Sequence, residues 1–153
     1  MSGRGGNDDL LGETGRDRLY GGAGADQLSG GTGKDRLYGG AGSDDVAGGG
    51  GADHLWGGAD ADRFVFDSTA SIARDTIHDF VRGSDKIDLT DLSETGMTWI
   101  AGAAFDGTDG QLRAFFSRGG VLVQGDTNGD GRADFQLFVQ NVTSLSALHF
   151  LLI

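Results

Sequence analysis

Seven aspartates recur at intervals of nine residues through the first half of the chain, and their spacing suggests metal chemistry. They are Asp8, Asp17, Asp26, Asp35, Asp44, Asp53 and Asp62. Each follows a glycine-rich stretch, whose exposed backbone carbonyls add further oxygen ligands. Carboxylates and backbone carbonyls are the ligands that Ca²⁺ prefers. The spacing therefore predicts an array of metal sites rather than a catalytic centre.

The aspartates belong to a repeat that fills residues 3–65 without a gap. Its template is Gly-Gly-x-Gly-x-Asp-x-U-x, in which U is a large apolar residue. The U positions are Leu10, Leu19, Leu28, Leu37, Val46, Leu55 and Phe64. Departures lie near the ends, where Arg4, Glu13 and Asp60 replace glycines. A flexible glycine-rich linker is the alternative, but a linker needs no such register.

The structural unit is predicted to be two nonapeptides. Residues 15–24, GRDRLYGGAG, recur at 33–42 as GKDRLYGGAG, an offset of 18 residues. One coil would then be turn, short strand, turn, short strand, and the stacked coils would form an all-β parallel β-roll. Its two edges would each carry a column of aspartates. Asp8, Asp26, Asp44 and Asp62 form one column, and Asp17, Asp35 and Asp53 form the other.

The spacing of stacked coils suits calcium in the turns. Neighbouring strands lie about 4.8 Å apart, so an ion midway would lie about 2.4 Å from oxygens above and below. The gaps between successive aspartates in the two columns predict about five such ions. The carbonyl ligands expected in the turns belong to Gly6, Gly15, Gly24, Gly33, Gly42 and Gly51.

Folding of the repeat should depend on this calcium. Each nonapeptide buries only one large side chain, which is too little to offset the ordering of nine residues. Bare carboxylates in a column also repel one another. We therefore expect a disordered calcium-free repeat that folds on binding calcium.

The amino-acid composition limits the classes of partner that the chain can bind. The formal net charge is -11, and 21 of the 23 acidic residues are Asp, with Glu13 and Glu94 as the exceptions. This acidity argues against nucleic acid as a main partner. The absence of cysteine rules out disulfides and thiolate metal sites. No apolar run reaches membrane-spanning length, and the first ten residues lack the apolar core of a signal peptide.

The second half has a different pattern and is expected to cap the roll. Strands are predicted at 63–66, 75–80, 86–89, 111–118, 121–124 and 135–139. Gly119-Gly120 is the expected hairpin turn, and residues 144–150 are expected to form a short helix. The domains are thus predicted as a roll at 1–66 and a β-rich cap at 67–153.

Other acidic residues in this half allow two interpretations. Asp126, Asn128 and Asp130 match the start of a calcium loop, with Asp134 as a further ligand. The alternative is an Asp/Gly hairpin turn. Elsewhere, Asp75, Asp79, Asp85 and Asp88 are interpreted as solvated turn acids, although one of them binding calcium is the alternative.

No residues for catalysis stand out. The histidines His54, His78 and His149 lack the HExxH spacing of a zinc protease, and no GxSxG or phosphate-binding loop is present. We predict a chain without catalytic residues of its own. A complete small enzyme is the least favoured alternative.

One outward face of the roll is predicted to be basic and aromatic. Its residues are Arg16, Arg18, Tyr20, Lys34, Arg36, Tyr38, His54 and Trp56. Guanidinium groups suit carboxylates, and flat aromatic rings suit sugar faces, so an anionic polysaccharide is one candidate ligand. Packing against a neighbouring domain and a plain solvated surface are the alternatives.

The chain resembles known families along almost its whole length. The nonapeptide is similar to that of RTX (repeats-in-toxin) proteins. Residues 61–92 and 126–139 resemble the C-terminal domain of serralysin-type metallopeptidases, and RTX modules (R-modules) of alginate (mannuronan) epimerases are also similar.

That resemblance implies a non-catalytic module that supports the folding, stability and secretion of a larger extracellular bacterial enzyme. Its partners would be calcium, a catalytic domain outside this chain and the type I secretion machinery. A C-terminal signal is then expected at residues 142–153. The epimerase resemblance points to alginate as the polysaccharide for the alternative function.

Overall fold

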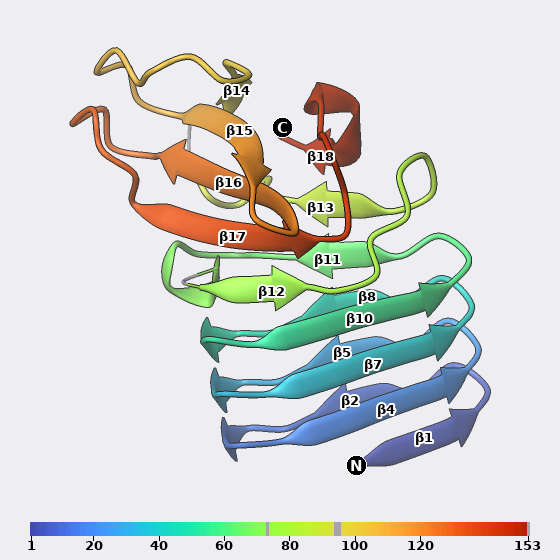
Figure 1. The fold of residues 1–153 in the computed structure, drawn as a ribbon. Coiled ribbons are helices and arrows are strands. Elements are labelled where there is room, and N and C mark those ends of the chain that lie inside the picture. Colours follow the sequence, from blue (N-terminus) through green and yellow to red (C-terminus); the bar gives the residue numbers. More distant parts are fainter. Residues whose placement is uncertain (73, 94–95, 153) are drawn as a thin grey trace.

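The computed structural model describes residues 1–72, 74–93 and 96–152, so Ile153, the last residue of the expected secretion signal, lies outside the described residues. The chain forms a parallel β-roll of stacked coils with a β-rich cap at its C-terminal end (Figure 1). The predicted fold class is confirmed.

Two walls of short strands make up the roll. The first contains β1 (Ser2–Gly5), β4 (Arg18–Ala23), β7 (Arg36–Ala41) and β10 (His54–Ala59). The second contains β2 (Asp9–Leu11), β5 (Gln27–Ser29), β8 (Asp45–Ala47) and β11 (Arg63–Val65). A narrow sheet along one edge contains β3 (Thr14–Gly15), β6 (Thr32–Gly33) and β9 (Gly50–Gly51).

Coils stack in parallel with an offset of 18 residues. In the first wall Arg18 pairs with Arg36, and Tyr20 pairs with Tyr38. In the second wall Leu10 pairs with Leu28. Because side chains alternate along a strand, the U residues all point between the walls. Each of these seven side chains is at most 3% exposed.

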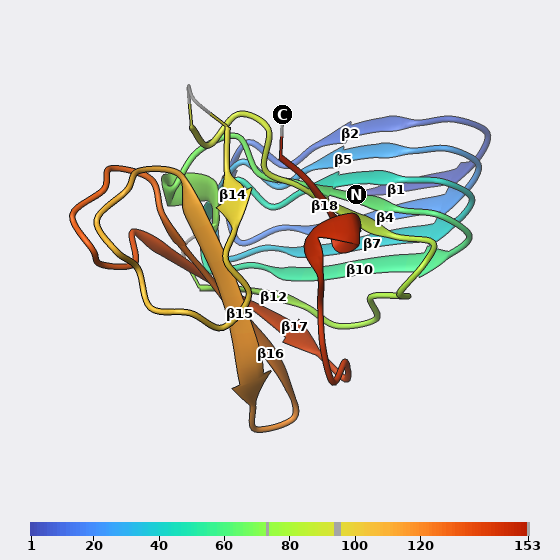
Figure 2. The ribbon, with the colours of Figure 1, turned by 90° about the horizontal axis from the view of Figure 1, so that it is seen from above.

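The C-terminal half continues both walls beyond residue 66. Its elements are η1 (Ala70–Ile72), β12 (Asp75–Ile77), β13 (Lys86–Asp88), β14 (Thr98–Trp99), β15 (Gln111–Ser117), β16 (Gly120–Asp126), β17 (Phe135–Gln140), η2 (Ala147–His149) and β18 (Phe150–Leu151). β12 pairs with β10, and β13 pairs with β11. β17 then pairs with β12, and β18 pairs with β13. Beyond β17, β16 and β15 extend the sheet of the first wall (Figure 2).

The predicted strand at 63–66 is β11 of the roll, and the five strands predicted after it are present with small differences, whereas β14 and β18 were not predicted. The predicted strand at 75–80 ends at Ile77, and the hairpin turn is at Arg118 and Gly119, one residue earlier than expected. The expected helix is one 3₁₀ turn. The helices in the described ranges are single turns, and none has the length or apolarity of a membrane span.

Backbone geometry explains the glycine template. The second and fourth positions have left-handed φ angles, which glycine adopts without strain. Arg4, Glu13 and Asp60, which replace glycines at such positions, keep φ values of 89°, 70° and 80°. The turn geometry is therefore conserved even where the sequence departs from the template.

Two adjacent glycines provide a matched test of this geometry. A Cβ at Gly49 (φ 84°) would overlap the Gly31 carbonyl, whereas the nearest atom to a Cβ at Gly50 is 3.9 Å away. We expect Gly49→Ala to destabilise the calcium-loaded protein by about 1–3 kcal/mol or more, because strain and overlap add. Gly50→Ala should change stability little. Thermal unfolding of both variants checks this, and equal melting temperatures would contradict it.

Candidate calcium sites and the outer face of the roll

Two columns of aspartates run along the edges of the roll, each linked by one repeated hydrogen bond. The backbone N–H of Asp8 donates to Oδ1 of Asp26 at 2.8 Å, and Asp26 donates to Asp44 in the same way. On the other edge, Asp17 donates to Asp35, also at 2.8 Å. The predicted division into two columns is confirmed by these contacts.

The second carboxylate oxygen of each aspartate has no protein partner. Within the described residues, the buried side-chain oxygens without a hydrogen bond are Oδ2 of Asp8, Asp17, Asp26, Asp35, Asp44, Asp53, Asp62 and Asp75. Buried polar atoms are nearly always hydrogen-bonded, so a regular series of unpaired oxygens indicates a missing binding partner.

Five of the unpaired oxygens lie close to a carbonyl of the next coil. Oδ2 of Asp26 and the carbonyl oxygen of Gly39 both lie 2.5 Å from the position that a Cβ on Gly21 would occupy. The same arrangement recurs at Gly3, Gly12, Gly30 and Gly39. The close carbonyls thus belong to first-position glycines, which sequence reasoning did not select. The expected carbonyls of Gly6, Gly15, Gly24 and Gly33 lie close to the fourth-position glycine one coil later. Calcium binding by these carbonyls and by those of Gly42 and Gly51 stays a prediction.

These oxygens fit a hard divalent cation. Carboxylate and carbonyl oxygens are calcium ligands, and calcium accepts an irregular shell of six to eight of them. No three Asp, Glu, His or Cys side chains in the described part of the chain are grouped so as to hold a metal by themselves. A calcium shell here must therefore combine carboxylates with backbone carbonyls.

Burial makes the carboxylates easier to protonate when no cation is bound. Burial is the main cause that raises the pKa of Asp53 to about 6, of Asp62 to about 7 and of Asp75 to about 8. A backbone N–H bond opposes the rise in each case, and a neighbouring carboxylate adds to it. Burial likewise raises the pKa of Asp35 and Asp44.

These shifts predict that acid partly substitutes for calcium. A raised folded-state pKa stabilises the fold at low pH, and this stability is lost as pH rises through the folded pKa, here from about 6 to about 8. In calcium-free buffer we expect more β-structure at pH 5 than at pH 8.5, measured by circular dichroism. Saturating calcium should remove the difference. Greater calcium-free structure at pH 8.5 would contradict the prediction.

The interpretation of Asp75, Asp85 and Asp88 as solvated turn acids is wrong. Their exposures are 0%, 2% and 8%, because Asp75 begins β12, Asp85 immediately precedes β13 and Asp88 ends β13, and both strands pair with the last coil. Asp79 is half-buried, and its carboxylate accepts hydrogen bonds from the backbone N–H groups of Gly57 and Gly58. Asp79 thereby satisfies the N–H groups at the end of β10, because β12 pairs only with the beginning of that strand.

The 126–134 loop has the geometry of a closed hairpin turn. Asp126 is buried, and its carboxylate accepts backbone N–H groups of Gly129 and Gly131, each at 2.8 Å. Asp134 accepts the N–H of Thr127 and the side-chain amide of Asn128. The loop's internal bonds favour the hairpin interpretation, and calcium binding by Asp126, Asn128, Asp130 and Asp134 stays a prediction.

The aromatic residues of the first wall form a stacked column. Ring centroids of Tyr20 and Tyr38 are 4.8 Å apart, and those of Tyr38 and Trp56 are 4.5 Å apart. His78 of the C-terminal half continues the column, 4.0 Å from Trp56. The rings cover one another's faces, so the expected stacking of sugars on flat aromatic faces does not fit the interior of this column.

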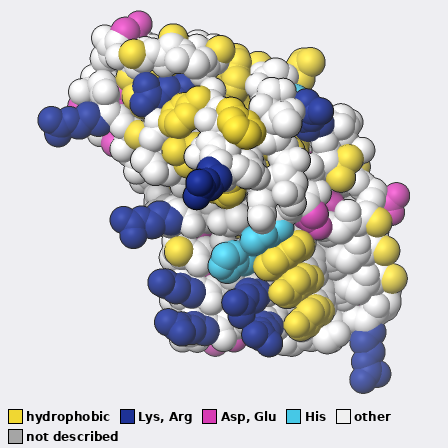
Figure 3. All heavy atoms as spheres, viewed as in Figure 1, with side chains coloured by type: hydrophobic (Ala, Val, Ile, Leu, Met, Phe, Trp, Pro, Cys, Tyr) yellow, Lys and Arg dark blue, Asp and Glu magenta, His cyan; other side chains and the backbone are white. Residues whose placement is uncertain are grey.

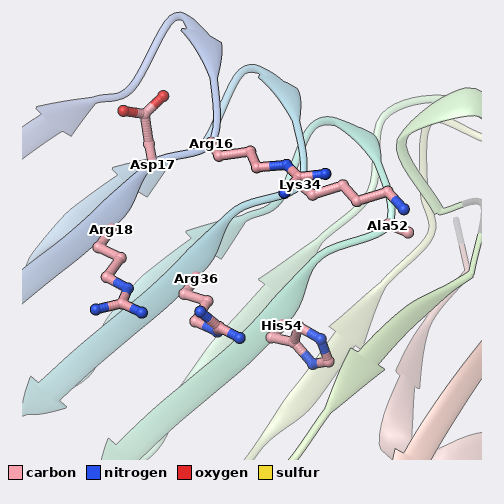
Figure 4. Close-up of a pocket in the computed structure, with 7 residues that line it drawn as sticks. All are labelled: Arg16, Asp17, Arg18, Lys34, Arg36, Ala52 and His54. Atoms are coloured by element: carbon pink, nitrogen blue, oxygen red, sulfur yellow. The ribbon is translucent and has the colours of Figure 1, made fainter.

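Beside the column lies a cationic groove (Figures 3 and 4). Arg16, Arg18, Lys34, Arg36, Ala52, His54 and Asp17 line it, and its volume is about 370 Å³. Burial, together with His78 and Arg36, lowers the pKa of His54, whose Nδ1 lies 2.8 Å from Nε2 of His78. The predicted basic residues are thus brought together, in a protein of net charge -11.

Comparisons with known proteins agree with this geometry. The family model for the RTX calcium-binding nonapeptide repeat matches residues 2–37 and 38–68. Comparison with curated protein sequences found no match.

Two solved structures are similar over most of the chain, and both are subunits of the Azotobacter vinelandii mannuronan C5-epimerase. The AlgE6R3 subunit is 30% identical, with a TM-score of 0.70, over 92% of this chain and 80% of that one. The AlgE6R2 subunit is 31% identical, with a TM-score of 0.62, over 99% and 89% respectively.

Proposed function

Since the chain belongs to the RTX calcium-binding repeat family, we propose that it is a non-catalytic module that folds when calcium fills the two aspartate columns. About five ions would lie between successive coils. The proposed carboxylate ligands are Asp8, Asp17, Asp26, Asp35, Asp44, Asp53 and Asp62.

One observation carries this proposal. The buried Oδ2 atoms are unpaired in every coil, and they recur at the same place in each turn. A divalent cation would provide the missing partner and would also relieve the repulsion between stacked carboxylates. Magnesium fits less well, because it demands shorter bonds and octahedral geometry.

We extend the proposal to secretion with a larger enzyme. The similar solved structures are parts of an epimerase, and RTX repeats are typical of secreted proteins. In the expected signal at 142–153, Phe150 is buried and pairs with Ile87. A secretion apparatus would therefore read this segment before the cap folds, which agrees with folding after export into calcium-rich surroundings.

A calcium titration tests the folding proposal. Circular dichroism should show little β-structure in EGTA, a cooperative gain on adding calcium, and a much weaker response to magnesium. Structure that is unchanged by calcium removal would contradict the proposal.

Two Asn variants make the titration specific. Asp35→Asn should weaken calcium binding roughly tenfold or more, because this carboxylate lies between two proposed ions. Asp91→Asn is the control, since Asp91 lies at an exposed turn of the cap. Equal calcium midpoints for both variants would exclude Asp35 as a ligand.

A second candidate function is binding of an anionic polysaccharide such as alginate. The observation in its favour is the groove of Arg16, Arg18, Lys34 and Arg36, whose guanidinium and ammonium groups suit a chain of carboxylates. The epimerase named for the similar structures acts on mannuronan, which gives the candidate its ligand class. With the aromatic faces covered, charge rather than ring stacking would provide the affinity.

Titration with alginate oligomers at low salt tests this second function. Amide signals of residues 16–20 and 34–38 should shift, and the double variant Arg18→Ser/Arg36→Ser should bind about tenfold more weakly. The control is Arg118→Ser/Arg132→Ser, which removes the same charge from exposed sites elsewhere. Stationary signals, or equal weakening by both pairs of substitutions, would refute a specific groove.

A further inference from the structure

We propose that the roll holds two more calcium ions, one between Asp53 and Asp75 and one between Asp62 and Asp85. This inference rests on the proposed calcium-bound roll and extends it past the nonapeptide run. Asp75 and Asp85 lie outside the residues that the RTX family model matches.

Asp75 continues the second column. The backbone N–H of Asp53 donates to Oδ1 of Asp75 at 2.8 Å, the same contact and distance that join Asp35 to Asp53. The following backbone hydrogen bond also repeats. The N–H of Thr76 donates to the carbonyl of Asp53, just as the N–H of His54 donates to the carbonyl of Asp35. Asp75 thus occupies the sixth position of a nonapeptide-like half-coil.

Asp85 continues the first column in the same way. The N–H of Asp62 donates to Oδ1 of Asp85 at 3.2 Å, and Lys86 N–H donates to the Asp62 carbonyl at 2.9 Å. Phe64 pairs with Ile87, so the core position is also kept. One detail differs, because Oδ2 of Asp85 accepts the N–H of Val81. Asp85 therefore resembles a final member of the column.

The unpaired oxygens exceed what five ions account for. Oδ2 of Asp8, Asp17, Asp26, Asp35 and Asp44 each lies near a carbonyl of the following coil, so five ions between repeat coils would serve these five aspartates. Oδ2 of Asp53 and Oδ2 of Asp62 remain buried and unpaired, and the half-coils that follow them carry Asp75 and Asp85. Two further ions between these pairs would provide both partners.

Side-chain cations do not provide this neutralisation. The ion pairs in the described ranges join Arg63 to Asp45 and Asp88, and none involves Asp53, Asp62, Asp75 or Asp85.

The backbone carbonyls near these two proposed sites differ from those of the inner coils. The three nearest atoms to a Cβ on Gly48 or Gly57 all belong to Asp53 or Asp62, respectively. Water or other carbonyls would complete these end shells.

The two sites would make docking of the cap calcium-dependent. Asp75 begins β12 and Asp85 immediately precedes β13, the cap strands next to the last coil, so each ion would bridge the repeat and the C-terminal half. Calcium would then order the cap together with the roll rather than the repeat alone.

Ion counting tests the proposal on the full chain. Native mass spectrometry and calorimetric titration should give at least seven calcium ions for the unaltered chain. Asp75→Asn and Asp85→Asn should each bind one fewer, and the double variant two fewer. Asp91→Asn, at an exposed turn of the cap, should bind the unaltered number. Asn can still accept the N–H bond from the preceding coil, so the fold should survive.

The outcomes separate this inference from the proposed function. No calcium binding by the unaltered chain would overturn both. Five ions, or counts unchanged by the two substitutions, would overturn only the two added sites. If a variant fails to fold in calcium, the unaltered chain decides: a count of seven or more, with calcium-dependent shifts of the amides of Thr76 and Lys86, supports the sites, and a count of five overturns them.

Discussion

The structure depends on one electrostatic constraint, the burial of aspartate columns that carry no side-chain counter-charge. From Asp26 to Asp62, each Oδ1 accepts the N–H of the preceding coil, while each Oδ2 in the repeat is left without a partner. Neutralisation of these carboxylates therefore has to come from protons or from a bound cation. At neutral pH a divalent ion is the stronger of the two, which makes folding and ion binding one process.

The glycine template follows from the same constraint. A carboxylate can approach the next coil's carbonyl only if the first residue of the turn has no side chain, as at Gly21. The left-handed second and fourth positions then bring the chain back into register within a few residues. The core contributes less, because each half-coil supplies a single large apolar side chain. Glycine and aspartate spacing, more than hydrophobic patterning, specifies this fold.

Local patterns were enough to predict much of the molecule. The 18-residue coil, the alternation that buries Leu19 and exposes Tyr20, and five strands of the cap were readable from sequence, whereas β14 and β18 were not. The continuation to Asp75 and Asp85 was not, because inserted residues lengthen the spacing to 22 and 23. A search for Asp-x-U that allowed gaps would have found Asp75-Thr76-Ile77. The mutual covering of Tyr38 and Trp56 also escaped prediction, since alternation gives the face on which a side chain lies but not the orientation of its ring.

Calcium in the edges and charge on the outer face are physically linked. The same register that stacks the aspartates sets Arg18 beside Arg36, and so forms the cationic groove. Five divalent ions would nearly cancel the formal charge of -11, and seven would exceed it. A polyanion approaching the calcium-free chain would meet a net negative field and no ordered groove, whereas the calcium-loaded roll removes both obstacles. By linkage, any anionic polymer that binds this groove must in turn tighten calcium binding, even though the two ligands occupy different parts of the coil.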